Sequence, residues 1–108
     1  MDEDAEIARV QRLYPQAKKL THGGKTVVLI EAAEFRGGGV DRKIDLLLYP
    51  HPDLGYPTRL FYAEQLPFGQ NWSQHTLCQR QWWSPSRDGV QAMHHWDQIL
   101  AMHLREAK

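Results

Sequence analysis

The sequence predicts an α+β domain with an N-terminal helix, an antiparallel β-meander, a long loop and a C-terminal helix. Near both ends of the chain, apolar residues recur at three- and four-residue steps, which is helical spacing. The middle of the chain has shorter aromatic and β-branched runs bounded by glycine or proline, as strands usually are. The length of 108 residues suits a single domain spanning residues 1–108, because a domain normally takes about 100–150 residues.

An amphipathic helix is expected to begin near Asp4. The apolar positions of residues 4–20 are Ile7, Val10, Leu13, Tyr14, Ala17 and Leu20. Pro15 removes a backbone donor and clashes with the preceding turn, so the helix should end or kink near Tyr14. Residues 21–24, Thr-His-Gly-Gly, then indicate a turn.

Three antiparallel strands are predicted to form the meander, over residues 25–35, 40–49 and 58–63. The glycine-rich residues 36–39 should connect the first two strands as a hairpin. Residues 50–57 are too proline-dense for regular structure, so they are expected to form an irregular connection.

The chain from residue 66 to residue 83 alternates between polar and aromatic residues and is expected to be an irregular loop. Loops of this length in a small domain are often functional. Beyond it, Asp88 and Gln91 resemble a capping box that would begin a helix. Helical spacing then continues to the end of the chain through Val90, Met93, Trp96 or Asp97, Leu100 and Leu104.

Charge and composition exclude several classes of protein. Lys+Arg and Asp+Glu are both 13, so no basic excess favours nucleic acid as a partner. The longest apolar runs, 27–30 and 46–49, are far shorter than the ~20 residues that a membrane-spanning helix needs. The acidic N-terminus is unlike a signal peptide. We therefore expect a cytoplasmic protein with no membrane and no nucleic-acid partner.

Six histidines raise the question of a metal site. His94 and Asp97, three residues apart on the last predicted helix, could contribute two ligands. No third ligand is apparent in the sequence, and the single cysteine excludes a multi-cysteine zinc site. The solvated polar face of a helix is therefore the better interpretation, and no metal is expected.

Cys78, the single cysteine, is the main candidate for chemistry. A nucleophilic thiol must ionise, which a nearby positive charge such as Arg80 or His75 would assist. Asn71 stands seven residues upstream, close enough for one loop to bring its amide to a developing oxyanion. The structural interpretation is that Cys78 is a small buried apolar residue and Asn71 a turn residue.

Several short motifs resemble the ubiquitin-conjugating (E2) family. They are Tyr49-Pro50, Tyr56-Pro57, Leu77-Cys78 and Trp83-Ser84-Pro85, which leads into a helix. The likeness is strongest to the short prokaryotic E2-like proteins encoded beside E1-like and deubiquitinase-like genes. The chain departs from ordinary E2 enzymes in one motif: these have His-Pro-Asn before the cysteine, whereas here Asn71 stands near that place without the His and Pro.

The resemblance implies a minimal UBC-like fold and a thioester between Cys78 and a ubiquitin-like protein. It further implies an E1-like adenylating protein as partner, a first helix that faces it, transfer to an amine, and no cofactor. Asn71 is then the candidate oxyanion amide, and His75 a candidate for orienting the acceptor or lowering the pKa of the thiol.

Two alternatives stay open. In the first, an inactive E2-like adaptor binds proteins through Tyr56 and the aromatic residues of 72–83. In the second, a helix-capped β domain binds a small ligand between its sheet and the last helix.

Overall fold

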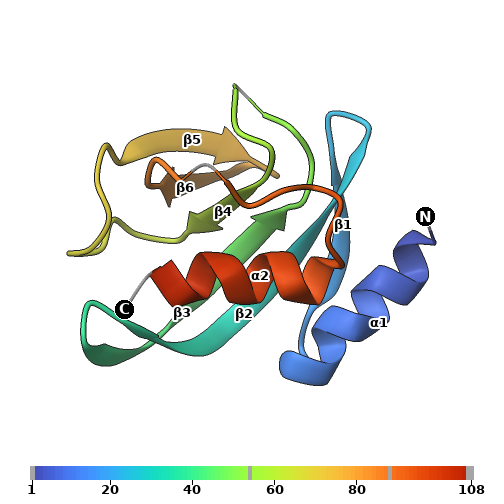
Figure 1. The fold of residues 1–108 in the computed structure, drawn as a ribbon, viewed down its shortest axis with the longest axis horizontal. Helices are drawn as coiled ribbons and strands as arrows, with labels where there is room; N and C mark the ends of the chain where they lie inside the picture. The colour runs from blue at the N-terminus through green and yellow to red at the C-terminus, as the bar shows by residue number, and fades with distance from the viewer. Residues whose placement is uncertain (1, 54, 88, 107–108) are drawn as a thin grey trace.

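Two helices lie on one face of an antiparallel sheet in the computed structural model, which describes residues 2–53, 55–87 and 89–106 (Figure 1). The elements are α1 Glu3–Leu13, β1 Lys18–His22, β2 Lys25–Gly37, β3 Val40–Tyr49, β4 Arg59–Tyr62, β5 Ser73–Leu77, β6 Arg80–Ser84 and α2 Trp96–Glu106. Within the described residues the strands form one six-stranded sheet in the order β1-β2-β3-β4-β6-β5. The predicted α+β class, with a helix near each end, is confirmed.

Helix α1 ends where the sequence predicts, but the chain after it differs from expectation. Asp2 caps the helix because its Oδ1 accepts hydrogen bonds from the backbone N–H groups of Asp4 and Ala5, at 3.0 and 3.3 Å. The last helical residue is Leu13, and Tyr14 is the C-cap. The expected turn at residues 21–24 was partly wrong, because residues 21 and 22 belong to β1 and only the two glycines form the turn.

The β2–β3 hairpin agrees with its predicted strands, although β2 runs two residues further than expected. A β-bulge interrupts the ladder between Ile30 and Ala33. Ala32, in the bulge, has a left-handed φ of 49°, and its N–H donates to Oδ1 of Asp45 at 2.7 Å. Asp45 therefore holds the bulge from the neighbouring strand.

The prediction that residues 66–83 are irregular was wrong, because this segment contains β5 and most of β6. The two strands are joined by a two-residue turn, Cys78-Gln79, and both turn residues have positive φ. Such turns usually carry Asn-Gly or another glycine pair, so the sequence has no hairpin signal here. In the part of the chain that the structure describes, one registered pair, Tyr62 with Trp83, joins this hairpin to the rest of the sheet.

Helix α2 begins at Trp96, later than predicted. Asp88, the proposed capping residue, lies outside the described residues. Val90 and Met93 precede the helix in an irregular segment, Val90 buried and Met93 81% exposed. Among the described residues no helix has both the length and the apolar character needed to cross a membrane.

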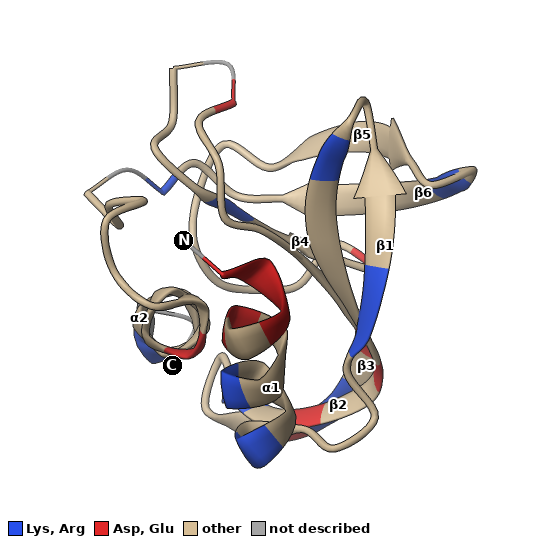
Figure 2. Ribbon diagram, turned by 90° about the vertical axis from the view of Figure 1, so that its right-hand side faces the viewer, with Lys and Arg blue, Asp and Glu red and all other residues tan. Residues whose placement is uncertain are grey.

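Apolar side chains fill both faces of the sheet. The larger cluster lies between the sheet and the two helices, which Figure 2 shows together on one side of it, and includes Val10, Ile30, Leu46, Trp96 and Ile99. The smaller cluster fills the opposite, helix-free face and consists of Val27, Leu29, Leu47, Tyr49, Phe61, Leu77 and Trp82. Burial of this second set requires the sheet itself to cover it.

The sheet covers this second cluster by curling. Strands β1 and β5 are at opposite ends of the strand order, yet His22 at the end of β1 contacts Cys78 beside β5. Side chains of β1 and β5 also line one common cavity. The curl thus brings His22 against the turn that contains Cys78.

Candidate functional site

Cys78 is the first residue of the tight turn between β5 and β6. Its φ is 51° and that of Gln79 is 63°, the left-handed combination of a type I′ turn. Side chains with a Cβ adopt this region at a cost of about 1–2 kcal/mol each. The turn is therefore strained, and it places the thiol at the closed end of a hairpin instead of within a strand.

The thiol is half-buried. Cys78 packs against the smaller apolar cluster, and its backbone N–H donates to Nδ1 of His22 at 3.4 Å. This bond leaves the proton of a neutral His22 ring on Nε2, so His22 positions the turn and does not act as a base at Nδ1. Burial raises the pKa of the Cys78 thiol, which lowers its thiolate fraction at neutral pH.

Arg80 fixes the other side of the turn. Its Nη1 lies 3.0 Å from Oδ2 of Asp45, the carboxylate that also holds the bulge in β2. The guanidinium stacks on the ring of Trp82 at 4.5 Å from its centroid. Because Trp82 Nε1 donates to the Leu77 carbonyl at 3.1 Å, the hairpin is closed by side chains as well as by its ladder.

A small cavity of about 180 Å³ adjoins this turn between β1 and β5. Its lining residues are His22, Tyr49, Asp53, Phe61, His75, Thr76 and Leu77. His75 lies edge-on to the Phe61 ring at 5.3 Å and shares a hydrogen bond of 2.7 Å with Ser73 Oγ. Burial, together with the charge of Arg59, lowers the pKa of His75, against an opposite effect of Asp53. The structure thus brings a neutral imidazole into the cavity next to the turn.

Asn71 is not brought to Cys78. It lies two residues before Ser73, at the open end of the hairpin, whereas Cys78 lies at the closed end. The strand between Ser73 and Leu77 alone spans about 14 Å, at about 3.4 Å per residue. The expectation that one loop folds Asn71 against Cys78 is therefore corrected by the hairpin that separates them. Asn71 is an exposed residue with a left-handed φ of 55°, which asparagine tolerates in turns.

Sequence reasoning missed His22, Gln79 and Asp45. Gln79 follows Cys78 directly and is exposed, so its side-chain amide is the nearest one along the chain. Only the curl of the sheet brings His22 to the turn, and only the bulge in β2 explains Asp45. No local pattern in the sequence predicts either contact, because His22 is 56 residues from Cys78 and the contact of Asp45 with Ala32 depends on the bulge in β2.

The arrangement can present a sulfur nucleophile at a protein surface. Cys78 packs against the smaller apolar cluster, and burial is the cause of its raised pKa. No group of three or more metal-ligating side chains is found in the described part of the chain. Comparisons with models of protein families, with curated proteins and with solved structures give no match. A function for this protein is therefore inferred from the geometry of the Cys78 turn and from the sequence motifs.

Proposed function

We propose that this protein is an E2-like carrier that accepts a ubiquitin-like protein on Cys78 and passes it to an amine. The order of helix, antiparallel strands, cysteine turn, Trp-Ser-Pro and helix supports a minimal UBC-like assignment. The single observation that carries the proposal is the placement of Cys78. A purely structural cysteine is best accommodated in a strand or helix facing the core, whereas this one occupies a strained turn at the edge of the sheet.

The proposed reaction has two acyl transfers. In the first, Cys78 releases its proton to solvent, and its sulfur attacks the thioester carbon that joins the ubiquitin-like C-terminus to the E1-like protein. The C–S bond to the E1-like thiol breaks, and that thiolate leaves. In the second, an uncharged amine attacks the new thioester, a C–N bond forms, Cys78 leaves as a thiolate, and the amine proton passes to solvent.

The raised pKa of Cys78 suits a carrier. A thiol with a higher pKa is a poorer leaving group, so an acyl group on it survives longer before transfer. The same property makes the free thiol a slow nucleophile toward small reagents. The proposal therefore relies on the partner proteins to align the reacting carbon, since orientation supplies much of the rate in such transfers.

The amide that stabilises the oxyanion is assigned in this proposal to Gln79. Gln79 follows Cys78 directly in the chain and is exposed, whereas Asn71 is at the far end of the hairpin. His75 remains a candidate for orienting the acceptor from the neighbouring cavity. The proposed partners are an E1-like adenylating protein, facing α1, and a ubiquitin-like protein.

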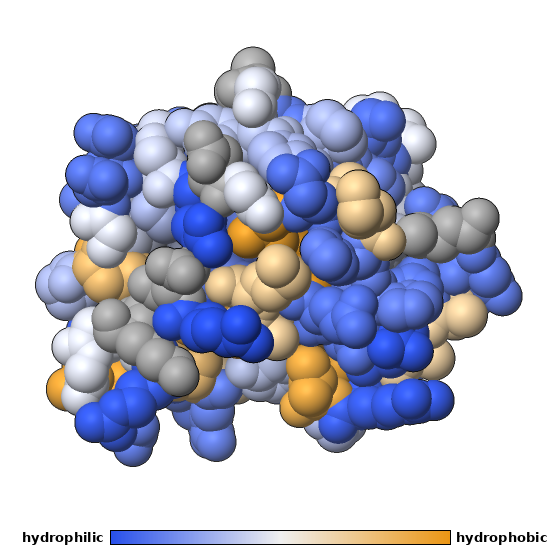
Figure 3. Space-filling view, viewed as in Figure 1, coloured by the Kyte–Doolittle hydropathy of each residue, from blue (hydrophilic) through white to orange (hydrophobic). Residues whose placement is uncertain are grey.

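In the adaptor alternative, Tyr56 and the aromatic side chains between residues 72 and 83 would form an exposed patch that binds a partner protein. Trp82 is 1% exposed, and Trp72, Trp83 and Tyr56 are only half-exposed. Figure 3 shows the helix-bearing face as mostly hydrophilic by Kyte–Doolittle hydropathy, with apolar side chains in small separate groups. The limited exposure of the aromatic side chains named above favours a carrier over a protein held by an aromatic patch.

The direct test is incubation with a cognate E1-like protein, ATP and the ubiquitin-like protein. We expect an adduct that thiol reductant removes from the wild type, none in Cys78→Ala, and a reductant-resistant ester in Cys78→Ser. Gln79→Ala should slow discharge to an amine by about 10²-fold, the lower range for loss of one oxyanion donor. Gln81→Ala, an exposed control on β6, and Asn71→Ala should leave the rate unchanged.

Labelling of the single thiol gives an independent measurement. We expect Cys78 to react with a neutral aromatic disulfide in the folded protein, with a rate that rises with pH into the alkaline range. Protection of the thiol until the protein unfolds, or an adduct that persists in Cys78→Ala, would reject the carrier and leave the adaptor.

A further inference from the structure

Strand β5 leaves one edge of the sheet open. It is the last strand in the order β1-β2-β3-β4-β6-β5, so among the described strands it pairs with β6, and Figure 1 shows it at the upper left margin of the ribbon. The hydrogen bond from Cys78 to His22 reaches the turn beyond β5 and not the strand itself. The free edge of a terminal strand presents backbone N–H and C=O groups to which a further strand can pair.

The register of the hairpin decides which residues of β5 face this open edge. In a hairpin with a two-residue turn, the flanking residues, here Leu77 and Arg80, bond to one another, and bonded pairs then alternate along the ladder. His75 therefore also directs its backbone groups to β6, whereas Gln74 and Thr76 direct theirs outward. Both of these residues are exposed, and within the described ranges no group bonds their outward N–H and C=O.

The open edge of β5 lacks the features that usually prevent pairing between proteins. Natural edge strands are often protected by lysine, by proline or by a bulge. Residues 73–77, Ser-Gln-His-Thr-Leu, contain no lysine, proline or carboxylate, and their ladder with β6 is regular. The opposite edge strand, β1, begins with Lys18 and Lys19, whose charges protect that edge. The two edges of the sheet are therefore not equivalent.

Two copies of β5 are complementary to one another in one register. When they run antiparallel about a two-fold axis at His75, Gln74 of each copy lies opposite Thr76 of the other. Each such pair exchanges two backbone hydrogen bonds, and all the outward groups of both residues are used. An axis at Gln74 would place Thr76 opposite residue 72, and an axis at Thr76 would place Gln74 opposite Cys78; both of these positions lie outside β5.

Uncharged side chains would meet at this axis. The two His75 side chains would lie opposite one another on the same face of the joined sheets. Burial, with the charge of Arg59, lowers the pKa of His75 against an opposite effect of Asp53, so the rings are neutral at physiological pH. The rest of the strand carries no charged residue. A second copy is therefore not repelled, and every molecule in solution supplies one.

We propose that two copies of this chain associate edge to edge through β5, about a two-fold axis at His75, so that their sheets become one continuous sheet. Cys78 lies beyond the end of the strand and off the axis, so this inference does not depend on the proposed carrier function. A single edge ladder is smaller than the interface of a permanent dimer. The association should therefore be reversible and depend on protein concentration.

Disulfide trapping tests the register. In the Cys78→Ala background, His75→Cys puts one thiol at the axis, where the two Cα atoms would be about 4.5 Å apart, within the range of a disulfide. The matched control is Gln74→Cys in the same background, which would face Thr76 of the other copy. In a glutathione buffer, we expect the covalent dimer to form at least roughly tenfold faster from His75→Cys, because association brings its thiols together. Random collision predicts the reverse order, since Gln74 is exposed and His75 half-buried.

Sedimentation equilibrium gives a second readout, which needs no cysteine variant. The wild type should show a monomer–dimer equilibrium at millimolar concentration. Thr76→Pro removes the outward N–H but no ladder bond to β6, and proline is tolerated at a sheet edge, so the dimer Kd should rise roughly tenfold. Thr76→Val, the control, keeps this N–H and should change the Kd by less than twofold.

The two measurements cover for one another. If His75→Cys fails to fold, sedimentation decides, and if Thr76→Pro fails to fold, trapping decides. A wild type that is monomeric at millimolar concentration overturns the proposal and leaves the edge to an extended segment of another protein. Trapping of Gln74→Cys as fast as that of His75→Cys, or equal Kd values for the two Thr76 variants, also overturns it.

Discussion

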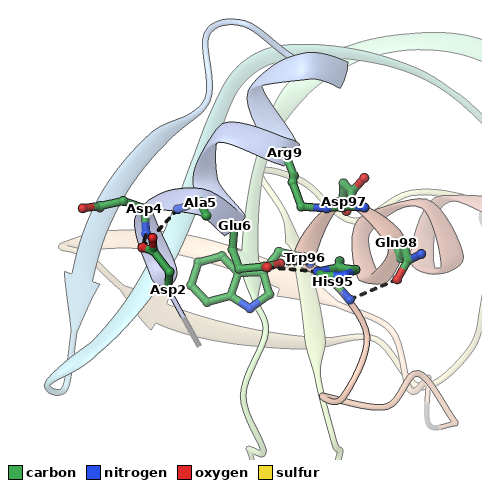
Figure 4. A network of polar contacts seen from close by, with 9 residues as sticks. All are labelled: Asp2, Asp4, Ala5, Glu6, Arg9, His95, Trp96, Asp97 and Gln98. Carbon is green, nitrogen blue, oxygen red and sulfur yellow. Dashed lines mark hydrogen bonds and ion pairs between the residues drawn. The ribbon is translucent and has the colours of Figure 1, made fainter.

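The carboxylate of Glu6 in α1 accepts a hydrogen bond from the backbone N–H of Trp96, 90 residues later in the chain, at 2.8 Å (Figure 4). The first turn of α2 is thus capped by the other helix. The second oxygen of Glu6 is 3.0 Å from Nδ1 of His95, and Arg9 pairs with Asp97 at 2.9 Å alongside. The two terminal helices are joined by these polar contacts at the N-terminal end of α2.

Removing this cap should weaken the fold. Glu6 is 5% exposed, so Glu6→Ala leaves the Trp96 N–H without an acceptor, at an expected loss of about 1–3 kcal/mol in the free energy of unfolding. Glu31→Ala, which breaks only the exposed pair with Lys18, should cost less than about 1 kcal/mol. Urea unfolding of both variants checks this. Equal losses would mean that Glu6 does not cap α2.

Acidification should destabilise the protein through Glu6. Burial alone would raise the pKa of this carboxyl, but the Trp96 hydrogen bond, the bond and charge of His95 and the charge of Arg9 lower it below its ordinary value. A group with a depressed folded pKa stabilises above its unfolded pKa, near 4.5, and that contribution is lost as pH falls below it. Glu6→Gln should therefore lose less stability than the wild type when the pH is lowered through this window.

His103 should produce a second, higher window of pH dependence. Its folded pKa of about 4 is below the ordinary 6.5, so between these values the unfolded chain holds a proton that the folded chain does not. As the pH is lowered from 6.5 to about 4, the free energy of unfolding should fall by up to about 1.4 kcal/mol per pH unit. His103→Gln should lack that slope. A His103 ring that titrates near 6.5 in the folded protein, measured by NMR, would contradict the assignment.

Relaxing the strained turn should stabilise the protein. Gln79 has a φ of 63°, so Gln79→Gly removes a steric cost and should raise the free energy of unfolding by about 1 kcal/mol. The matched control is Gln81→Gly on β6, where glycine should instead destabilise by about 0.5–1 kcal/mol. Urea unfolding compares the two. A loss of stability on both substitutions would show that the turn is not strained at this residue.

Asp45 should contribute more to the free energy of unfolding than its partial exposure implies. Its carboxylate holds both the Ala32 N–H in the bulge and the Arg80 guanidinium, at 2.7 and 3.0 Å. Asp45→Ala should cost about 1–2 kcal/mol, because the N–H of the bulge loses a charged acceptor. Asp41→Ala, whose side chain is 90% exposed and pairs with Arg36, is the control and should change stability little.

The sequence predicts the individual helices and strands better than it predicts the contacts between them. Helix α1 ends at Leu13, two residues before Pro15, because proline restricts the residues immediately before it. Strand β3 has the predicted bounds because glycine and proline flank it. Strands β5 and β6 were missed because Cys78-Gln79 lacks the residues that normally mark a type I′ turn. The start of α2 was misplaced because its cap, Glu6, is supplied by another helix.

The site was only partly predictable for the same reason. Cys78 stands out as the single cysteine, and His75 lies in the cavity beside its turn. Asn71 is close to Cys78 in sequence, but an extended hairpin converts seven residues into a long separation. His22 is distant in sequence and adjacent in space, since the curl of the sheet brings β1 against β5. A short separation in sequence therefore does not place two residues together when the chain between them is an extended strand, and a long one does not keep them apart when the sheet curls.

The single ladder pair between Tyr62 and Trp83 gives the β5–β6 hairpin a degree of mechanical independence. Apart from this pair, the junction depends on side chains such as Ser84, whose hydroxyl bonds the Leu60 carbonyl. The closed end of the hairpin is held separately, by the ion pair of Arg80 with Asp45 and by the hydrogen bond from the Cys78 N–H to His22. The position of the cysteine therefore depends on β1 and β3 more than on the strand that β6 adjoins in the sheet.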